Sequence, residues 1–86
     1  MDKHIVFGVH ITDRVKHAHK VQDIFTEYGC QIRTRLGLHE ADERICSPNG
    51  LILLEMAGEE SKCHEMADKL NAVEGVEVQK MIFDHP

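Results

Sequence analysis

Hydrophobic and polar residues follow two different periods along the chain. A period of two predicts strands over residues 3–11, 30–39 and 76–83, and the nearly unbroken apolar run over 51–56 is typical of a strand buried on both faces. A period of about 3.6 predicts a helix that begins at Thr12–Asp13–Arg14 and ends at Gly29, and a second helix over 60–73. Residues 40–49 are expected to form a polar loop.

The order of these elements predicts an α+β fold, a ferredoxin-like βαββαβ sandwich that fills residues 1–86 as a single domain. We expect a four-stranded antiparallel sheet with two helices on one face, and with the first and third strands in the middle. The other face would expose Val6, Gly8, alternate residues of the third strand, and Met81 or Phe83. Because a monomer rarely exposes such a patch, the pattern predicts a dimer or tetramer formed through the open face or an edge strand.

Side-chain alternation also assigns faces within each element. In the second strand we expect one set of residues to face the core and Arg33 and Arg35 to point from the open face. Cys30 and Cys63 are expected to point inward. The core-facing sets are Ile32, Thr34, Leu36 and Leu38 in that strand, and Ala18, Val21, Ile24, Phe25 and Tyr28 in the first helix.

Composition narrows the possible functions. The net charge of −5 argues against direct binding to nucleic acid, which needs a basic surface. No apolar run approaches the roughly 20 residues of a membrane span, and the N-terminus lacks the apolar core of a signal peptide, so we expect a cytoplasmic protein without a membrane partner. The three cysteines show no C-x-x-C spacing, which argues against a disulfide framework, whereas seven histidines raise the question of a metal.

A metal site is one hypothesis for His10, His39 and Cys46. The two histidines would lie near one end of parallel strands, about 10 Å apart at the backbone, and Cys46 lies on the loop at that end. Such a set suits Zn, Ni, Fe or Co. The alternative is two polar residues on a sheet face and an unrelated loop thiol.

An anion site is a second hypothesis, built on Arg33 and Arg35. These side chains are suited to grip a carboxylate or phosphate, together with the amide groups at the start of the first helix. The alternative is a set of ion pairs between subunits, with the acidic loop 40–43. No catalytic constellation is present in the sequence, so we expect no enzyme; the enzymatic alternative is a small dimeric ferredoxin-like enzyme with Arg33, Arg35 and His10 around a pocket.

The segment 11–15, followed by an amphipathic helix that ends at Tyr28–Gly29–Cys30, resembles ACT domains, which are small regulatory modules that pair and bind small molecules at their interfaces. In that family the turn after the first strand usually reads Asp-Arg-Pro-Gly. Asp13 and Arg14 match it, and Val15 and Lys16 replace the Pro-Gly. The resemblance implies an ACT-like fold and adds Thr12, Asp13 and Arg14 to the candidate ligand-binding residues.

A second resemblance covers the whole chain. Residues 35–38, a polar loop and residues 49–55 are similar to stand-alone, ACT-like proteins known as iron-only hydrogenase system regulators, which share their shape with the C-terminal domain of the nickel-responsive repressor. Of the repressor's nickel ligands, His39 is kept, and Gly37 and Gly50 replace the others. The resemblance implies a regulatory, ligand-sensing homo-oligomer; a transition-metal-binding protein is the first alternative and a small enzyme the second.

Overall fold

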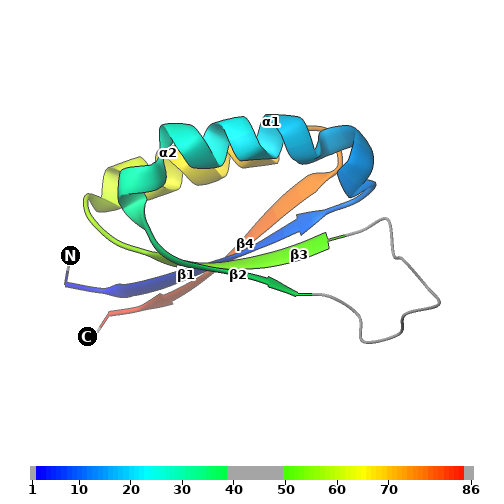
Figure 1. Cartoon of the computed structure of the whole chain (residues 1–86). Helices are drawn as coiled ribbons and strands as arrows, with labels where there is room; N and C mark the ends of the chain where they lie inside the picture. The colour runs from blue at the N-terminus through cyan, green and yellow to red at the C-terminus, as the bar shows by residue number, and fades with distance from the viewer. Residues whose placement is uncertain (1, 39–49, 85–86) are drawn as a thin grey trace.

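The computed structural model describes residues 2–38 and 50–84, and it confirms the predicted order of strands and helices (Figure 1). Within these residues, neither helix is long and apolar enough to span a membrane. The elements are β1 (His4–Ile11), α1 (Arg14–Glu27), a short 3₁₀ helix (Gly29–Gln31), β2 (Ile32–Leu38), β3 (Gly50–Met56), α2 (Glu60–Asn71) and β4 (Val76–Phe83).

The four strands form one sheet in the order β2-β3-β1-β4, and every neighbouring pair is antiparallel. β1 and β3 are therefore central, as their apolar sequences predict. The register places Gly8 beside Leu53 on β3 and beside Gln79 on β4. Both helices cover the same face of the sheet, and the opposite face carries no element of the described chain (Figure 1).

The core lies between the helices and the covered face of the sheet. In β1 alternate residues are buried, whereas His4 and His10 on the other face are exposed. In α2 the buried face consists of Cys63, Met66, Ala67 and Leu70, and the Cys63 thiol donates to the Ala57 carbonyl oxygen at 3.4 Å. The largest fully buried side chains are Phe7, Ile5, Leu54, Met66, Leu70, Val9, Val21 and Cys63.

In α1 the buried stripe is shifted slightly from the predicted one. Val21, Phe25 and Tyr28 are buried as predicted, but Ala18 is exposed and His17 is buried at 9% exposure. The prediction for Ala18 was wrong because the helix rotates the neighbouring His17 toward the α2–β4 turn. Cys30, predicted to point inward, is exposed.

The turn between β1 and α1 is joined to the turn before β4. The Thr12 amide donates to the Gly75 carbonyl oxygen at 2.7 Å, and the His17 ring packs against Gly75. Asp13 takes the N-cap position with φ 54° and ψ 64°, a left-handed conformation that Asp tolerates better than most residues. It was predicted as a possible cap, but it makes no side-chain capping hydrogen bond.

In β2 the predicted faces hold for Ile32 and Arg33 but are wrong from Thr34 onward. The pairing with β3 shifts by one residue between Ile32 and Thr34, so Leu36 and Leu38 point from the open face and are 53% and 43% exposed. Arg35 instead lies on the helix side, with its guanidinium 4.8 Å from the centre of the Phe25 ring. A shift of one residue exchanges the two faces of a strand, which is why simple alternation fails here.

Candidate functional site: the open face of the sheet

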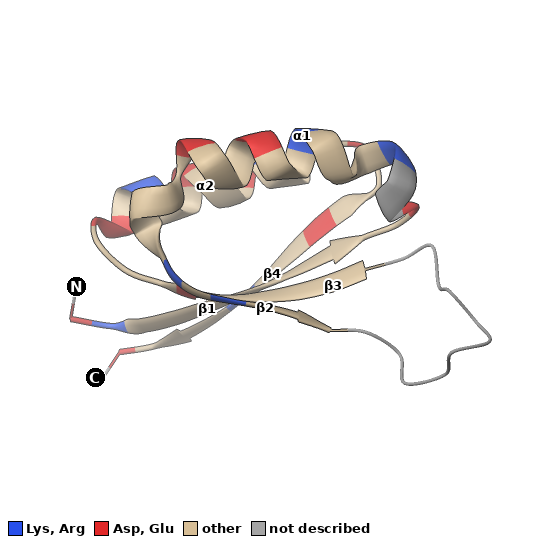
Figure 2. Ribbon diagram, in the orientation of Figure 1, with Lys and Arg blue, Asp and Glu red and all other residues tan. Residues whose placement is uncertain are grey.

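The face of the sheet opposite the helices is apolar along one diagonal. Figure 2 shows few charged positions along the strands, and the register places large apolar side chains of four strands next to one another on this face. Three of them, Leu36, Met81 and Phe83, are exposed by 50% or more, and so large a contiguous apolar patch is unusual in a monomer. We call this set the apolar band; it consists of Leu36, Leu38, Leu51, Leu53, Val6, Met81 and Phe83.

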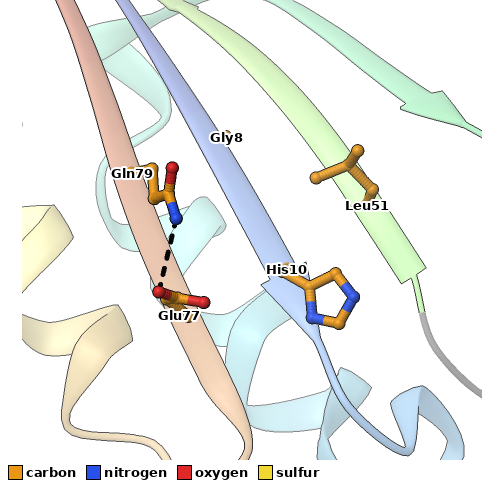
Figure 3. Close-up of a pocket in the computed structure, with 5 residues that line it drawn as sticks. All are labelled: Gly8, His10, Leu51, Glu77 and Gln79. Atoms are coloured by element: carbon orange, nitrogen blue, oxygen red, sulfur yellow. Dashed lines mark hydrogen bonds between the residues drawn. The ribbon is translucent and has the colours of Figure 1, made fainter.

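A shallow hollow lies on one side of the apolar band, near the end of β1 (Figure 3). Its volume is about 270 Å³, and it is lined by Gly8, His10, Leu51, Glu77 and Gln79. The Gln79 side-chain amide donates to the Glu77 carboxylate at 3.4 Å, and His10 stands beside Glu77 in the register. We call this feature the Gly8 hollow, because the missing side chain of Gly8 leaves the space between Leu53 and Gln79 open.

A second polar region lies on the other side of the apolar band, where β2 begins. The Thr34 hydroxyl donates to one Glu55 carboxylate oxygen at 2.8 Å. The Arg33 guanidinium approaches the other oxygen at 3.9 Å, and the Arg33 side chain stays 63% exposed. We call Arg33, Thr34 and Glu55 the arginine corner. Its positive group is held only loosely by its own chain, because a 3.9 Å ion pair on an exposed surface is weak.

The predicted anion site is not assembled by the described residues. Arg33 lies on the open face, whereas Arg35 lies on the helix side and donates to the Gln22 side-chain oxygen at 3.1 Å. Thr12 and Asp13 form the β1–α1 turn at the far end of the sheet, roughly 20 Å along the strands from Arg33. Arg14 begins α1, and its side chain lies outside the described part of the structure.

The predicted metal site falls partly outside the described residues. His10 is exposed on the open face, as predicted, whereas His39 and Cys46 belong to segment 39–49, which the structure does not describe. Among the described residues, no group of three or more His, Cys, Asp or Glu side chains could hold a metal ion. Glu77, which the sequence did not single out, lies beside His10 because of the β1–β4 register.

A network of side chains on the helix side joins α2 to β4. The Lys80 ammonium donates to His64 Nδ1 at 2.7 Å, so His64 presents its Nε2–H to the Glu60 carboxylate at 3.3 Å. Lys3 approaches the other Glu60 oxygen at 3.3 Å. Hydrogen bonds from His64 and Lys3 hold the pKa of Glu60 below its ordinary value. This network could not be predicted from the sequence, because Lys3 and Lys80 lie far along the chain from Glu60 and His64.

Two further ionisable groups are shifted by their surroundings. Burial raises the pKa of the Cys63 thiol, which keeps it protonated and unreactive at neutral pH. The hydrogen bond to Glu27 at 2.8 Å raises the pKa of Lys69, which links α2 to α1. Both groups belong to the helical layer and contribute to its packing, so neither adds chemistry to the open face.

Comparison with known proteins adds information about the fold. No protein-family model matches the sequence, and no curated protein matches it significantly. An uncharacterized protein of Thermotoga maritima has a similar structure, with a TM-score of 0.77 and 20% identity over 93% of this chain and 96% of that one.

Two proteins with known ligands or activities are similar at lower scores. A formyltetrahydrofolate deformylase of Pseudomonas putida matches with a TM-score of 0.55 and 10% identity, over 91% of this chain and 28% of its own. CPII of Thiomonas intermedia, whose structure contains ADP, AMP and acetate, matches with a TM-score of 0.55 and 10% identity, over 94% of this chain and 86% of its own. The chain thus has a ferredoxin-like fold that recurs both in a small stand-alone protein and as part of a larger enzyme.

Proposed function

We propose that this chain is a non-enzymatic regulatory module that senses a small ligand and acts as a homo-oligomer. The apolar band supports this proposal more than any other observation. Leu36, Met81 and Phe83 expose 53%, 55% and 50% of their surface on a face that no element of the described chain covers. Fully burying one such side chain from full exposure is worth about 1.5–3 kcal/mol, so covering the exposed half of several of them would stabilise an oligomer formed through this face.

The test is the subunit number of the untagged protein, measured by native mass spectrometry and light scattering. We expect a dimer or tetramer, and we expect Leu36→Glu to weaken it by placing a charge in the apolar band. Ala18→Glu is the matched control, since Ala18 is exposed on α1 and the same charge there leaves assembly unchanged. A wild-type protein that stays monomeric throughout the accessible concentration range contradicts the proposal.

The ligand is the second part of the proposal. CPII, which shares the fold, was found with ADP, AMP and acetate, so these three compounds are the first probes to try. Isothermal titration calorimetry with each probe tests sensing directly. Saturable binding together with a change in subunit number supports a ligand-responsive oligomer. Binding that leaves subunit number unchanged argues for a carrier rather than a sensor.

The sequence resemblance also indicates a system in which this module could act. Residues 35–38 and 49–55 are similar to iron-only hydrogenase system regulators, and we propose a regulatory role in such a system, exerted through another protein. Deleting the gene in a host that has this hydrogenase should change hydrogen production without removing the hydrogenase itself. Unchanged production under inducing conditions would separate this chain from that pathway.

A transition-metal-binding protein is the alternative, favoured by the exposed His10 beside Glu77. The native mass spectrum of protein purified without a chelator decides between the two. About one Ni, Zn, Fe or Co ion per subunit, lost in His10→Ala and in His39→Ala, would establish the metal site. Retention of the ion in both variants would assign it to other ligands.

A further inference from the structure

The polar groups of the open face are arranged so that the face is complementary to itself. The apolar band runs from Leu38 on β2 to Phe83 on β4, with the arginine corner on one side of it and the Gly8 hollow on the other. The arginine corner carries the exposed Arg33 guanidinium beside the Glu55 carboxylate, and the Gly8 hollow carries the Glu77 carboxylate. A two-fold axis that runs along the apolar band would bring each such pair of unlike regions together twice.

We propose that a second copy of this chain packs its open face against the first, with the two-fold axis along the apolar band, and inserts its Arg33 into the Gly8 hollow. This inference rests on the proposed homo-oligomer and specifies its interface. Rotation about an axis along the band places the band of one copy on that of the other. It also exchanges the two sides, so each arginine corner lies over the Gly8 hollow of the second copy.

Repulsion between the two Glu77 carboxylates disfavours the perpendicular axis and so favours the axis along the band. An axis across the band would place each Gly8 hollow over itself, and Glu77 would face Glu77 of the second copy across a closed interface. Like charges placed opposite one another in an interface cost several kcal/mol. An axis along the band instead sets Arg33 against the Glu77 of the second copy, and each dimer contains this pairing twice.

The Gly8 hollow has the chemistry and the space for an arginine side chain. The Glu77 carboxylate and the Gln79 side-chain oxygen are both hydrogen-bond acceptors, which suit the planar fork of a guanidinium group. Gly8 adds no side chain to the floor: a Cβ atom built there would meet only Leu53 and the Gln79 carbonyl, at 3.9 and 4.0 Å. The guanidinium of Arg33 is available, because its contact with Glu55 is long and exposed.

The size of the open face suits a second copy. Four strands about 4.8 Å apart and seven residues long span roughly 450 Å² in projection. Two facing copies therefore bury about 900 Å² if the faces are treated as flat. A proposed interface should bury at least about 1,000 Å² in total. The leucine, methionine and phenylalanine side chains of the apolar band protrude from this plane, and their extra surface raises the total buried area to that range.

The decisive experiment is an exchange of charges. Arg33→Glu and Glu77→Arg should each weaken the dimer by about 30-fold or more in sedimentation equilibrium, because each leaves a like-charge pair in the closed interface. The double variant R33E/E77R should recover most of that loss, since the pair is rebuilt with its charges exchanged. Lys20→Glu and Asp68→Arg are the controls, at exposed positions on α1 and α2, and they should leave the dimer unchanged.

The outcomes separate this inference from the proposed function. An oligomer that survives both single substitutions, with no recovery in the double variant, overturns the pairing of Arg33 with Glu77 but leaves a homo-oligomer in place. A wild-type protein that is monomeric overturns both. Circular dichroism of each variant, unchanged from the wild type, shows that a lost dimer reflects the interface and not the fold.

Discussion

Filling the Gly8 hollow should affect the subunit and the dimer in opposite directions. The change is Gly8→Val, on the open face of the central strand β1. Glycine in a strand interior costs roughly 0.5–1 kcal/mol relative to alanine, because the unfolded chain gains freedom. The nearest atoms to a new Cβ atom lie at ordinary van der Waals distance, 3.9 and 4.0 Å. We therefore expect the free energy of unfolding of the subunit to rise by about 0.5–1 kcal/mol.

The same side chain should weaken the dimer. A valine at position 8 occupies the space that the proposed interface gives to Arg33, so the Glu77 carboxylate loses its partner while it stays covered. Truncating one side of a buried charge pair costs about 2–5 kcal/mol, which corresponds to roughly 30-fold to several thousand-fold in the dissociation constant. Gly8→Ala, which fills less of the space, should fall between the wild type and Gly8→Val.

Two measurements are needed, because dimer formation itself adds to apparent stability. Subunit stability is measured by urea unfolding in the Arg33→Glu background, at a protein concentration below the dissociation constant of that variant, so that the dimer does not form. Dimer dissociation is measured by sedimentation equilibrium in the otherwise wild-type chain. A lower urea midpoint for Gly8→Val would show that the hollow is needed for folding. An unchanged dissociation constant would show that the second copy does not enter the hollow. Either result refutes the reasoning.

Three further predictions follow from other contacts. Gly75→Ala should cost about 2–4 kcal/mol in urea unfolding, since φ is +81° and the new Cβ atom would lie 3.0 Å from His17; a loss below about 1 kcal/mol would contradict this. The pKa of Glu60 is lower in the folded state, so its contacts stabilise the fold above the ordinary pKa of Glu, and this stability is lost as the pH falls through the lowered pKa. In Glu60→Gln the urea midpoint should therefore fall less between about pH 5 and pH 3 than it does in the wild type. An equal fall in the two proteins would contradict this. Iodoacetamide should label Cys30 readily and Cys63 only after unfolding, as mass spectrometry of digests will show; equal rates in the native state would contradict the burial of Cys63.

Most of the fold could be predicted from the sequence, because local pattern and topology agree. β1 alternates strictly, and β3 is apolar on both faces because it is central. The prediction of the two faces of β2 failed for a specific reason. The alternation in this strand is equally regular in either register, and the shift between Ile32 and Thr34 depends on pairing with β3, which no local pattern reports. Arg35 tolerates the helix side because its aliphatic stem and guanidinium lie against Phe25.

The candidate site was only partly predictable. Two helices can cover only one face of the sheet, so the position of Val6, Gly8, Met81 and Phe83 on the uncovered face could be predicted. The position of Glu77 beside His10 could not be predicted, because it depends on the β1–β4 register, which is a long-range property. The predicted pairing of Arg33 with Arg35 had the same weakness: two residues apart in a regular strand implies one face, and the register shift separated them.

The shift in β2 also has an evolutionary consequence. It amounts to one extra residue, Arg33, in an edge strand. Loss of Arg33 would restore simple alternation, because Ile32 and Thr34 already pair with the consecutive β3 residues Met56 and Glu55, and it would leave Leu36 and Leu38 on the open face. A single codon deletion would thus remove one positive charge from the open face and leave the apolar band and the core strands intact. The charge and the apolar surface of this face can therefore change independently in descendants of this chain.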